Sequence, residues 1–289
     1  MQVITIFNEK GGVGKTTLTG IIGAGLAMRG HKVLLIDADG QGDLTTNQGL
    51  PKQAGFFKFV KWGNPKAPDF VDVKQIVKRV PPDVCSGYLY IVPGNEDTWG
   101  IPGSMTLVDI VSGLVKRLGL LEPVFDYVLV DTQPSATTLH DGIGLVSDWF
   151  ICPTELESAS ALQALPRTAQ HIENMREQSQ LRGRDKCKLM GIIPNKFRKS
   201  TSLHNNMYGV LIDGIRDRHG NLVPNERGEV FAGYGDLVWE PIPERINLPE
   251  AQLVKTTLMH DAPHLETNDY LWATIKRVEQ VSQDYVTHG

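Results

Sequence analysis

The sequence contains little cysteine, no long apolar run and no excess of positive charge. Its 289 residues include three cysteines, Cys85, Cys152 and Cys187, which are odd in number and widely spaced. This pattern argues against a disulfide framework and against a clustered zinc site. We expect Cys152, which lies in an apolar run, to be an ordinary core residue. No stretch approaches the roughly eighteen apolar residues of a membrane span, so no membrane contact is expected.

The N-terminus and the net charge set further limits. The chain starts directly as a strand, Met-Gln-Val-Ile-Thr-Ile-Phe, without a basic leader or cleavage site, so we expect a cytoplasmic protein. The formal net charge is −4, so the field of the whole molecule does not indicate a nucleic-acid-binding protein. A chain of this length buries about 75% of its unfolded surface and needs no disulfide or metal for stability.

Short apolar runs alternate with helical patterns along most of the chain. Strand-like runs occupy residues 2–7, 32–37, 88–92, 127–131, 149–152 and 189–193. Helical patterns occupy residues 16–29, 106–118 and 158–178. Continuously apolar strands that alternate with helices predict an α/β fold with a doubly wound, mostly parallel sheet and helices on both faces. Ligands of such sheets bind beyond the carboxyl ends of the strands.

Two segments interrupt this alternation. Residues 51–87 contain five prolines among scattered apolar residues, and we expect loops there with one or two short helices. Residues 213–235 are polar and carry turn signals near Gly220 and Gly228, which predicts an exposed, hairpin-like insertion. We therefore interpret residues 1–289 as a single domain with these two irregular additions.

A glycine-rich segment, Glu-Lys-Gly-Gly-Val-Gly-Lys-Thr-Thr, follows the first predicted strand at residues 9–17. The usual P-loop has glycine at the position of Glu9. The remaining glycines still let successive backbone N–H groups enclose an anion, and the dipole of the following helix adds to the attraction. The predicted nucleotide-binding residues of this segment are Glu9, Lys10, Gly11, Gly12, Val13, Gly14, Lys15, Thr16 and Thr17.

The chemistry of the last residues of this loop predicts ATP and Mg²⁺ as cofactors. Lys15 supplies a positive charge for the β- and γ-phosphates, and the hydroxyl of Thr16 suits a Mg²⁺ ligand. Thr17 is placed to meet the α-phosphate. A glycine-rich turn that binds nothing is the alternative, and the run of Lys-Thr-Thr between a strand and a helix argues against it.

Lys10 is a more specific feature of this loop than its glycines are. Residues 10–17 resemble the deviant Walker A box of the ParA/MinD superfamily, whose signature lysine reaches the phosphates of the partner subunit in an ATP-sandwich dimer. The resemblance implies that the chain is a homodimer in the ATP state. It also implies that Lys10 and Lys15 both take part in catalysis.

Two strand ends extend the resemblance. Asp37-Ala-Asp-Gly-Gln-Gly is similar to the first switch of ParA-type partition ATPases, Asp-x-Asp-Pro-Gln-Gly, with Gly40 at the usual proline. Tyr-Val-Leu-Val-Asp-Thr-Gln-Pro-Ser looks like their Walker B strand and second switch, with Gln133 at the first of two usual prolines. By resemblance, Asp39 orients the attacking water, Asp37 supports the Mg²⁺ shell and Asp131 belongs to the metal site. Carboxylates at strand ends are what phosphoryl transfer to water requires.

Downstream segments are similar to the family's adenine-binding side. Asn195, in Pro-Asn-Lys after a strand, resembles the residue that contacts the base, although a polar cap of the strand end is the alternative. Pro243, in the stretch from Trp239 to Ala251, resembles the proline whose neighbouring backbone flanks the adenine.

Other branches of the superfamily fit less well. Iron–sulfur relatives need cysteines near the second switch, and the segment around Asp131 has none. Membrane-bound relatives end in a basic amphipathic helix, whereas residues 270–286 carry mixed charges. This last segment places Leu271, Ile275 and Val278 on one face, so we expect a docked final helix.

The basic residues cluster locally. From Arg176 to Lys199 there are eight basic residues against two acidic ones, a local net charge of +6. We predict that this run belongs to a surface for non-specific DNA, with a solvated charge run as the alternative. The predicted DNA-binding residues are Arg182, Arg184, Arg198, Lys199, Arg216 and Arg218.

The resemblance therefore implies a dimerising, nucleoid-associated ATPase that binds DNA without sequence preference. A ParB-like partner would stimulate hydrolysis, and the cycle would partition a plasmid or chromosome. A positioning ATPase for a protein organelle, as in carboxysome systems, is one alternative. A metabolic P-loop enzyme of the dethiobiotin-synthetase kind is a second, and a membrane-tethered positioning factor is a weaker third.

Overall fold

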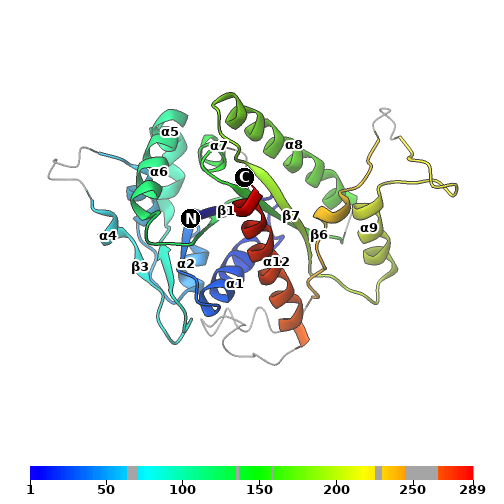
Figure 1. The fold of residues 1–289 in the computed structure, drawn as a ribbon, viewed down its shortest axis with the longest axis horizontal. Coiled ribbons are helices and arrows are strands. Elements are labelled where there is room, and N and C mark those ends of the chain that lie inside the picture. Colours follow the sequence, from blue (N-terminus) through cyan, green and yellow to red (C-terminus); the bar gives the residue numbers. More distant parts are fainter. Residues whose placement is uncertain (64–70, 135–136, 158, 225–229, 245–265, 289) are drawn as a thin grey trace.

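A seven-stranded sheet forms the centre of the molecule in the computed structural model, which describes residues 1–63, 71–134, 137–157, 159–224, 230–244 and 266–288 (Figure 1). The strand order is β3-β4-β2-β5-β1-β6-β7. The strands are β1 (Gln2–Ile6), β2 (Val33–Ala38), β3 (Lys78–Arg79), β4 (Leu89–Val92), β5 (Tyr127–Thr132), β6 (Trp149–Glu155) and β7 (Lys188–Asn195). Of these seven strands, only β3 pairs antiparallel, with β4 at one edge of the sheet. The predicted α/β fold with a mostly parallel sheet is confirmed.

Helices of very different lengths lie between the strands and after β7 in the described parts of the chain. They are α1 (Lys15–Met28), α2 (Asp43–Asn47), α3 (Gly55–Val60), α4 (Val73–Ile76), α5 (Ile101–Ser104), α6 (Leu107–Leu121), α7 (Thr138–Gly144), α8 (Ala159–Leu181), α9 (Ser202–Asp213) and α12 (Glu266–His288), with the 3-10 helices η1 (Glu96–Gly100) and η2 (Gly235–Leu237). A capping box between Thr106 and Asp109 starts α6, because each side chain satisfies a backbone N–H that the helix leaves free.

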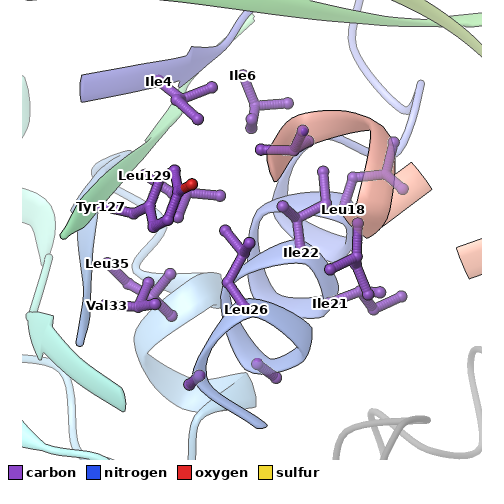
Figure 2. Packing of buried hydrophobic residues seen from close by; sticks show 14 of the residues in the cluster. Ile4, Ile6, Leu18, Ile21, Ile22, Leu26, Val33, Leu35, Tyr127 and Leu129 are labelled. Atoms are coloured by element: carbon purple, nitrogen blue, oxygen red, sulfur yellow. The ribbon is translucent and has the colours of Figure 1, made fainter. Parts of the chain in front are cut away.

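Alternating side chains of the central strands supply two apolar faces. Ile4 and Ile6 of β1 point to the face covered by α1 and α12, where Leu18, Ile22 and Leu26 of α1 meet the sheet (Figure 2). Successive strand residues point to opposite faces, so the residues between them serve the other layer.

The opposite face carries α3, α6 and α7 over one half of the sheet, with Val3, Leu34 and Val128 facing them. Helices α8 and α9 continue the cover over β6 and β7, where Phe150 and Ile192 are buried. In Figure 1, α5 and α6 lie at one end of the molecule and α9 at the other. All three cysteines are free and buried.

The final helix packs against α1. Leu271, Ile275 and Val278 are buried in the same core as α1. A side chain at Gly25 would collide with Ile275, because a Cβ there would lie 2.1 Å from its Cδ1. Glu279 accepts a hydrogen bond of 2.7 Å from Arg29, which ties the helix to the end of α1. Among the described residues, no helix combines the length and apolarity that a membrane crossing requires.

The two irregular segments differ in their relation to this core: the first contributes buried residues such as Phe56 and Phe59, and the second is largely exposed. The described part of residues 51–87 contains two short helices, α3 and α4, and the two-residue strand β3 that the sequence did not predict. In residues 213–235, antiparallel bridges join Arg216 to Leu222 and Pro224 to Val230, and most of the described side chains are exposed. Residues 64–70 and 225–229 lie outside the described residues.

Candidate functional site

The glycine-rich loop connects β1, near the middle of the sheet, to α1. Gly12 and Gly14 have left-handed φ angles of 78° and 94°. Gly14 is the residue that precedes α1, and no side chain caps that helix end. A Cβ at Gly14 would lie 2.2 Å from the amide nitrogen of Asn195, so glycine is required both by the backbone angle and by the close approach. Free N–H groups at the start of a helix form an anion site.

Lys15 brings a buried cation to this helix start. Its side chain is 6% exposed, and its ammonium donates a hydrogen bond of 3.0 Å to the carbonyl of Lys10. Burial lowers the pKa of Lys15, whereas the charges of Asp131 and Asp39 act to raise it. The carbonyl of Lys10 is a neutral acceptor. A bound phosphate would give this ammonium an anionic partner instead.

The sheet register brings Asp37 and Asp131 together. They are direct neighbours at the carboxyl ends of β2 and β5, and both are fully buried. Thr45 donates to Asp37 twice, from its backbone N–H at 2.8 Å and from its hydroxyl at 2.6 Å. Burial is the main cause that raises the pKa of Asp37 to about 6.

Asp131 lacks comparable support. Neither of its carboxylate oxygens accepts a hydrogen bond of ordinary geometry from the described residues, although the Thr16 hydroxyl is near enough to favour its ionised form. Burial first, and then the charge of Asp37, raise the pKa of Asp131 well above its ordinary value. A buried carboxylate without partners is costly unless a cation or proton neutralises it.

These residues fit a Mg²⁺ ion. Mg²⁺ is held by one or two carboxylates, phosphate oxygens and water, so it does not require a cage of protein ligands. No group of three or more potential metal-binding His, Cys, Asp or Glu side chains occurs among the described residues. Thr16 and Asp131 are the residues that would hold the ion, directly or through water, with Asp37 behind them.

A cavity of about 600 Å³ opens in front of the loop. Gly12, Gly14, Lys15, Thr16, Thr17, Asp39 and Asn195 line it, as do Gln41, Asp43, Asn47, Thr132, Pro134, Lys196 and Glu244. Of the other predicted residues, Glu9, Lys10, Gly11, Val13, Asp37, Asp131 and Pro243 are not among the lining residues of the described chain. Val13, Asp37 and Asp131 are buried behind the wall.

Asn195 and Pro243 lie on neighbouring segments at one side of this cavity. Asn195 ends β7, is 5% exposed, and donates a hydrogen bond of 3.0 Å to the carbonyl of Val13. Pro243 forms a parallel bridge with Phe197, and the adjacent Glu244 reaches the cavity wall. Residues 245–265, which include Ala251 of the predicted adenine-side stretch, lie outside the described residues.

Glu155 is a site residue that sequence reasoning missed. It ends β6 and lies beside Asn195 in the register of the sheet. One of its oxygens accepts a hydrogen bond from Lys196, and the other lies 3.7 Å from the ammonium of Lys10. Lys196 also donates to the carbonyl of Gly12 at 2.9 Å. An acidic residue at a buried strand end was the available signal, the same one that identified Asp37 and Asp131.

Glu9 contacts another group that the sequence did not predict. His171 of α8 lies 3.2 Å from the carboxylate of Glu9 and 2.9 Å from that of Asp141 in α7. Burial alone would lower the pKa of His171, but hydrogen bonds to Asp141 and Glu9 outweigh it and the pKa is raised. The imidazole therefore joins the phosphate loop to the helix that follows the second switch.

The second switch is held by a neutral histidine. His140 is buried, which lowers its pKa to about 4. Its Nε2–H donates a hydrogen bond of 2.9 Å to the carbonyl of Gln133, and its Nδ1 faces the Thr137 hydroxyl at 2.9 Å. Gln133, at a position where the family usually has proline, is thus fixed through its backbone.

The predicted DNA-binding residues do not form one cluster. Arg182 and Arg184 precede β7, whereas Arg198 and Lys199 follow it, and the eight residues of the strand span about 26 Å. Arg198 is already paired with Glu244 and Glu157.

The two arginines of the hairpin segment have local partners. Arg216 donates to the carbonyls of Asp213 and Gly220, both at 2.7 Å. Arg218 lies 3.3 Å from the ring of His219. Arg216 thus holds the hairpin together through its guanidinium, although its side chain is exposed.

The fold, the glycine-rich loop at the start of α1 and the strand-end carboxylates define a P-loop NTPase. A family model described as an AAA domain (AAA_31) matches residues 1–183. The chain belongs to this family, as a ParA-type partition or positioning ATPase of the ParA/MinD superfamily.

Similar proteins come from several bacteria. The chromosome partitioning protein ParA of Caulobacter vibrioides is 27% identical over 278 residues, which cover 94% of this chain and 91% of that protein. The maintenance of carboxysome distribution protein A of Synechococcus elongatus is 28% identical over 205 residues, covering 68% and 73%.

Solved structures share the fold. An ATP complex of a McdA variant from Cyanothece superimposes with a TM-score of 0.69 at 19% identity, covering 98% of this chain and 96% of that one. Cobyrinic acid a,c-diamide synthase from Mycobacterium smegmatis, with an ATP analogue and magnesium, gives 0.63 at 22% identity, covering 91% and 96%. At these identities the likeness shows the fold alone, and it includes a metabolic enzyme.

Proposed function

We propose that the chain is a single-domain ATPase that dimerises around two ATP·Mg²⁺, and that Lys10 completes the site of the partner subunit. The observation that supports this most directly is the position of Lys10. Its side chain is 30% exposed and lies 3.7 Å from Glu155, and Lys10 does not line the phosphate cavity of its own subunit among the described residues. A partly exposed cation beside the loop, which does not line the described wall of its own cavity, is available to a second copy.

In this proposal the resident groups neutralise and position the phosphates, because phosphoryl transfer depends mainly on charge and alignment. Lys15 and the loop N–H groups bind the β- and γ-phosphates. Asp39, half-buried at the cavity wall, holds the attacking water in line with the γ-phosphate. Thr16 and Asp131 would hold Mg²⁺, which would supply positive charge against the phosphate oxygens.

The base of the nucleotide would bind beside β7. Asn195 lines the cavity at the carboxyl end of β7, and it holds the loop through its side-chain amide nitrogen. Pro243 lies on the segment that bonds to β7 through the N–H of Ile242 and the carbonyl of Pro194, at 2.8 Å. These two segments would form the walls of an adenine site.

We further propose that the ATP dimer binds DNA without sequence preference in the nucleoid, within the cytoplasm. A ParB-like adaptor would stimulate hydrolysis and release the dimer, and repeated cycles would partition a plasmid or chromosome. Similarity to a chromosome partitioning ParA over 94% of the chain supports this cargo. Similarity to a protein that maintains carboxysome distribution supports the alternative of a protein organelle.

The lysine assignment is tested by replacing Lys10 with alanine. We expect Lys10→Ala to bind ADP like the parent but to remain monomeric with ATP in sedimentation-velocity runs, and to lose retention on DNA. Lys32→Ala, which removes an exposed lysine before β2, is the matched control and should dimerise normally. An ATP dimer of Lys10→Ala as stable as that of the parent would contradict the role in the partner's site.

The metabolic alternative requires a different readout. The fold likeness to cobyrinic acid a,c-diamide synthase keeps this class open. A partition or positioning ATPase should release phosphate from ATP with no small-molecule co-substrate, and DNA together with the adaptor should accelerate the release. Rates that respond only to an added carboxylic acid and amine source would favour the metabolic class.

A further inference from the structure

An exposed tryptophan covers the first switch. Gly40 is buried although it lies in the loop after β2, because the indole of Trp99 lies over it. A Cβ added at Gly40 would lie 2.1 Å from the indole Nε1 and 2.4 Å from two further ring atoms. Trp99 itself is 51% exposed, so one side of the ring packs on the switch and the other faces solvent.

The segment that carries Trp99 also contacts the first switch at a second point. Gly94, between β4 and η1, would place a Cβ 2.6 Å from the carbonyl oxygen of Asp37 and 3.0 Å from that of Asp39. Its N–H donates a hydrogen bond of 2.9 Å to the hydroxyl of Thr45, which in turn donates to Asp37. The chain from Gly94 to Trp99 therefore packs along the backbone that carries Asp39.

The local sequence explains why such support is needed. The first switch has glycine at residue 40, followed by Gln41 and by Gly42 with a left-handed φ of 65°. Glycine leaves the backbone the largest conformational freedom, whereas the proline usual in similar switches fixes φ near −65°. A bulky ring packed on Gly40 restricts the same loop from outside, and only a residue without Cβ allows that contact.

We propose that Trp99 is a positioning residue that holds the first switch, and with it Asp39, in the geometry for water attack. Trp99 packs on the backbone one residue beyond Asp39 and does not line the phosphate cavity, so it acts through the loop. This inference rests on the proposed ATPase function. It predicts a loss in the chemical step with nucleotide binding retained.

The first test replaces Trp99 with alanine and measures phosphate release in a single turnover of ATP. We expect a rate about tenfold lower, since small displacements of a reacting group cost about that much or more. The affinity for a fluorescent ATP analogue and the unfolding midpoint should stay close to those of the parent. Trp99→Phe, which keeps a ring over Gly40, should recover most of the rate. Tyr88→Ala is the matched control, because Tyr88 is an aromatic residue 52% exposed before β4.

The second test forms a double-mutant cycle with Gly40. Gly40→Ala should displace the indole and lower the rate as Trp99→Ala does, and the double variant should be no slower than either single one. Gly100→Ala adds a methyl group into open space one residue after Trp99 and should leave the rate unchanged.

The outcomes separate this inference from the function on which it rests. A parent protein that releases no phosphate from ATP, alone or with DNA and an adaptor, overturns the proposed function. A parent that hydrolyses ATP while Trp99→Ala keeps the full rate overturns the positioning role only. Strictly additive losses in the cycle, or a Trp99→Ala variant that loses ATP affinity and rate equally, also overturn it.

Discussion

Two regions of the molecule relate sequence order to spatial order in opposite ways. At the centre of the sheet, Asp37 and Asp131 are far apart in the sequence, yet the register of β2 and β5 makes them neighbours. At the edge, Arg184 and Arg198 belong to one basic run, yet β7 separates them. A parallel sheet gathers the carboxyl ends of its strands at one edge, and it moves apart residues that flank a single strand.

The difference between the two regions shows which sequence patterns predict where a residue lies in the fold. A charged residue at the end of an apolar strand has a predictable location, because all parallel strands end on the same side. A local excess of charge has no such location when a strand divides it. The position of Asp37 and Asp131 at one edge of the sheet was accordingly predictable, whereas the basic run was predictable only as a composition.

The largest expected effect concerns the central region, where Asp131→Asn removes a buried carboxyl group whose ionised form is disfavoured by burial. We expect ATP hydrolysis with Mg²⁺ to fall about 100-fold or more, because the metal loses a ligand or the acceptor of its bound water. In the absence of nucleotide the same change should raise the unfolding midpoint by about 2–4 °C, since no described residue forms an ordinary hydrogen bond to this carboxylate.

Two measurements check this pair of opposite effects. Phosphate release gives the rate, and thermal unfolding with and without Mg²⁺·ATP gives the stability. The parent should gain stability from Mg²⁺·ATP and Asp131→Asn should gain little. Asp83→Asn, at an exposed position, is the control and should change neither quantity. A less stable apo variant would show that Asp131 is well satisfied without a cation.

The sheet, its order of elements and the phosphate loop followed from local patterns. Gly14 needs both its left-handed φ and the space beside Asn195, and only the first of these reasons is visible in a sequence motif. Contacts between segments remote in sequence were not predictable in this way. Glu155 with Lys10, His171 with Glu9, and Trp99 over Gly40 each depend on where two separate strand or helix ends meet.

A second prediction divides the basic region at β7. Replacing Arg182 and Arg184 with alanine should lower the slope of log affinity for DNA against log salt by about 2 for each subunit, because each lost phosphate contact removes about 0.9. Replacing Arg198 and Lys199 should change the slope less, since Arg198 is already neutralised by Glu244 and Glu157.

The measurement is a salt series of DNA binding with the protein dimerised by ATP. Both double variants should retain ATP binding and dimerisation, which is the internal control. Equal losses for the two pairs would mean that DNA contacts both ends of β7. An unchanged salt slope for both double variants would place the DNA surface elsewhere. The basic run would then have no role in DNA binding.

The smallest expected effect returns to the central carboxylates and uses pH. The pKa of Asp37 is raised to about 6 by burial, above its ordinary value of 3.8, so the folded protein binds a proton here more tightly than the unfolded chain does. The stability that this group contributes is fully present below about pH 4 and is lost as the pH rises through 6.

Asp37→Asn cannot titrate, so the unfolding midpoint of the variant minus that of the parent should become more positive by about 3 °C between pH 4 and pH 7. Because the difference cancels the titration of all other carboxylates, it isolates the buried pair. A flat difference for Asp37→Asn would mean that Thr45 fully stabilises the ionised carboxylate. Asp37 and Asp131 would then not form a site with an excess of negative charge before a cation binds.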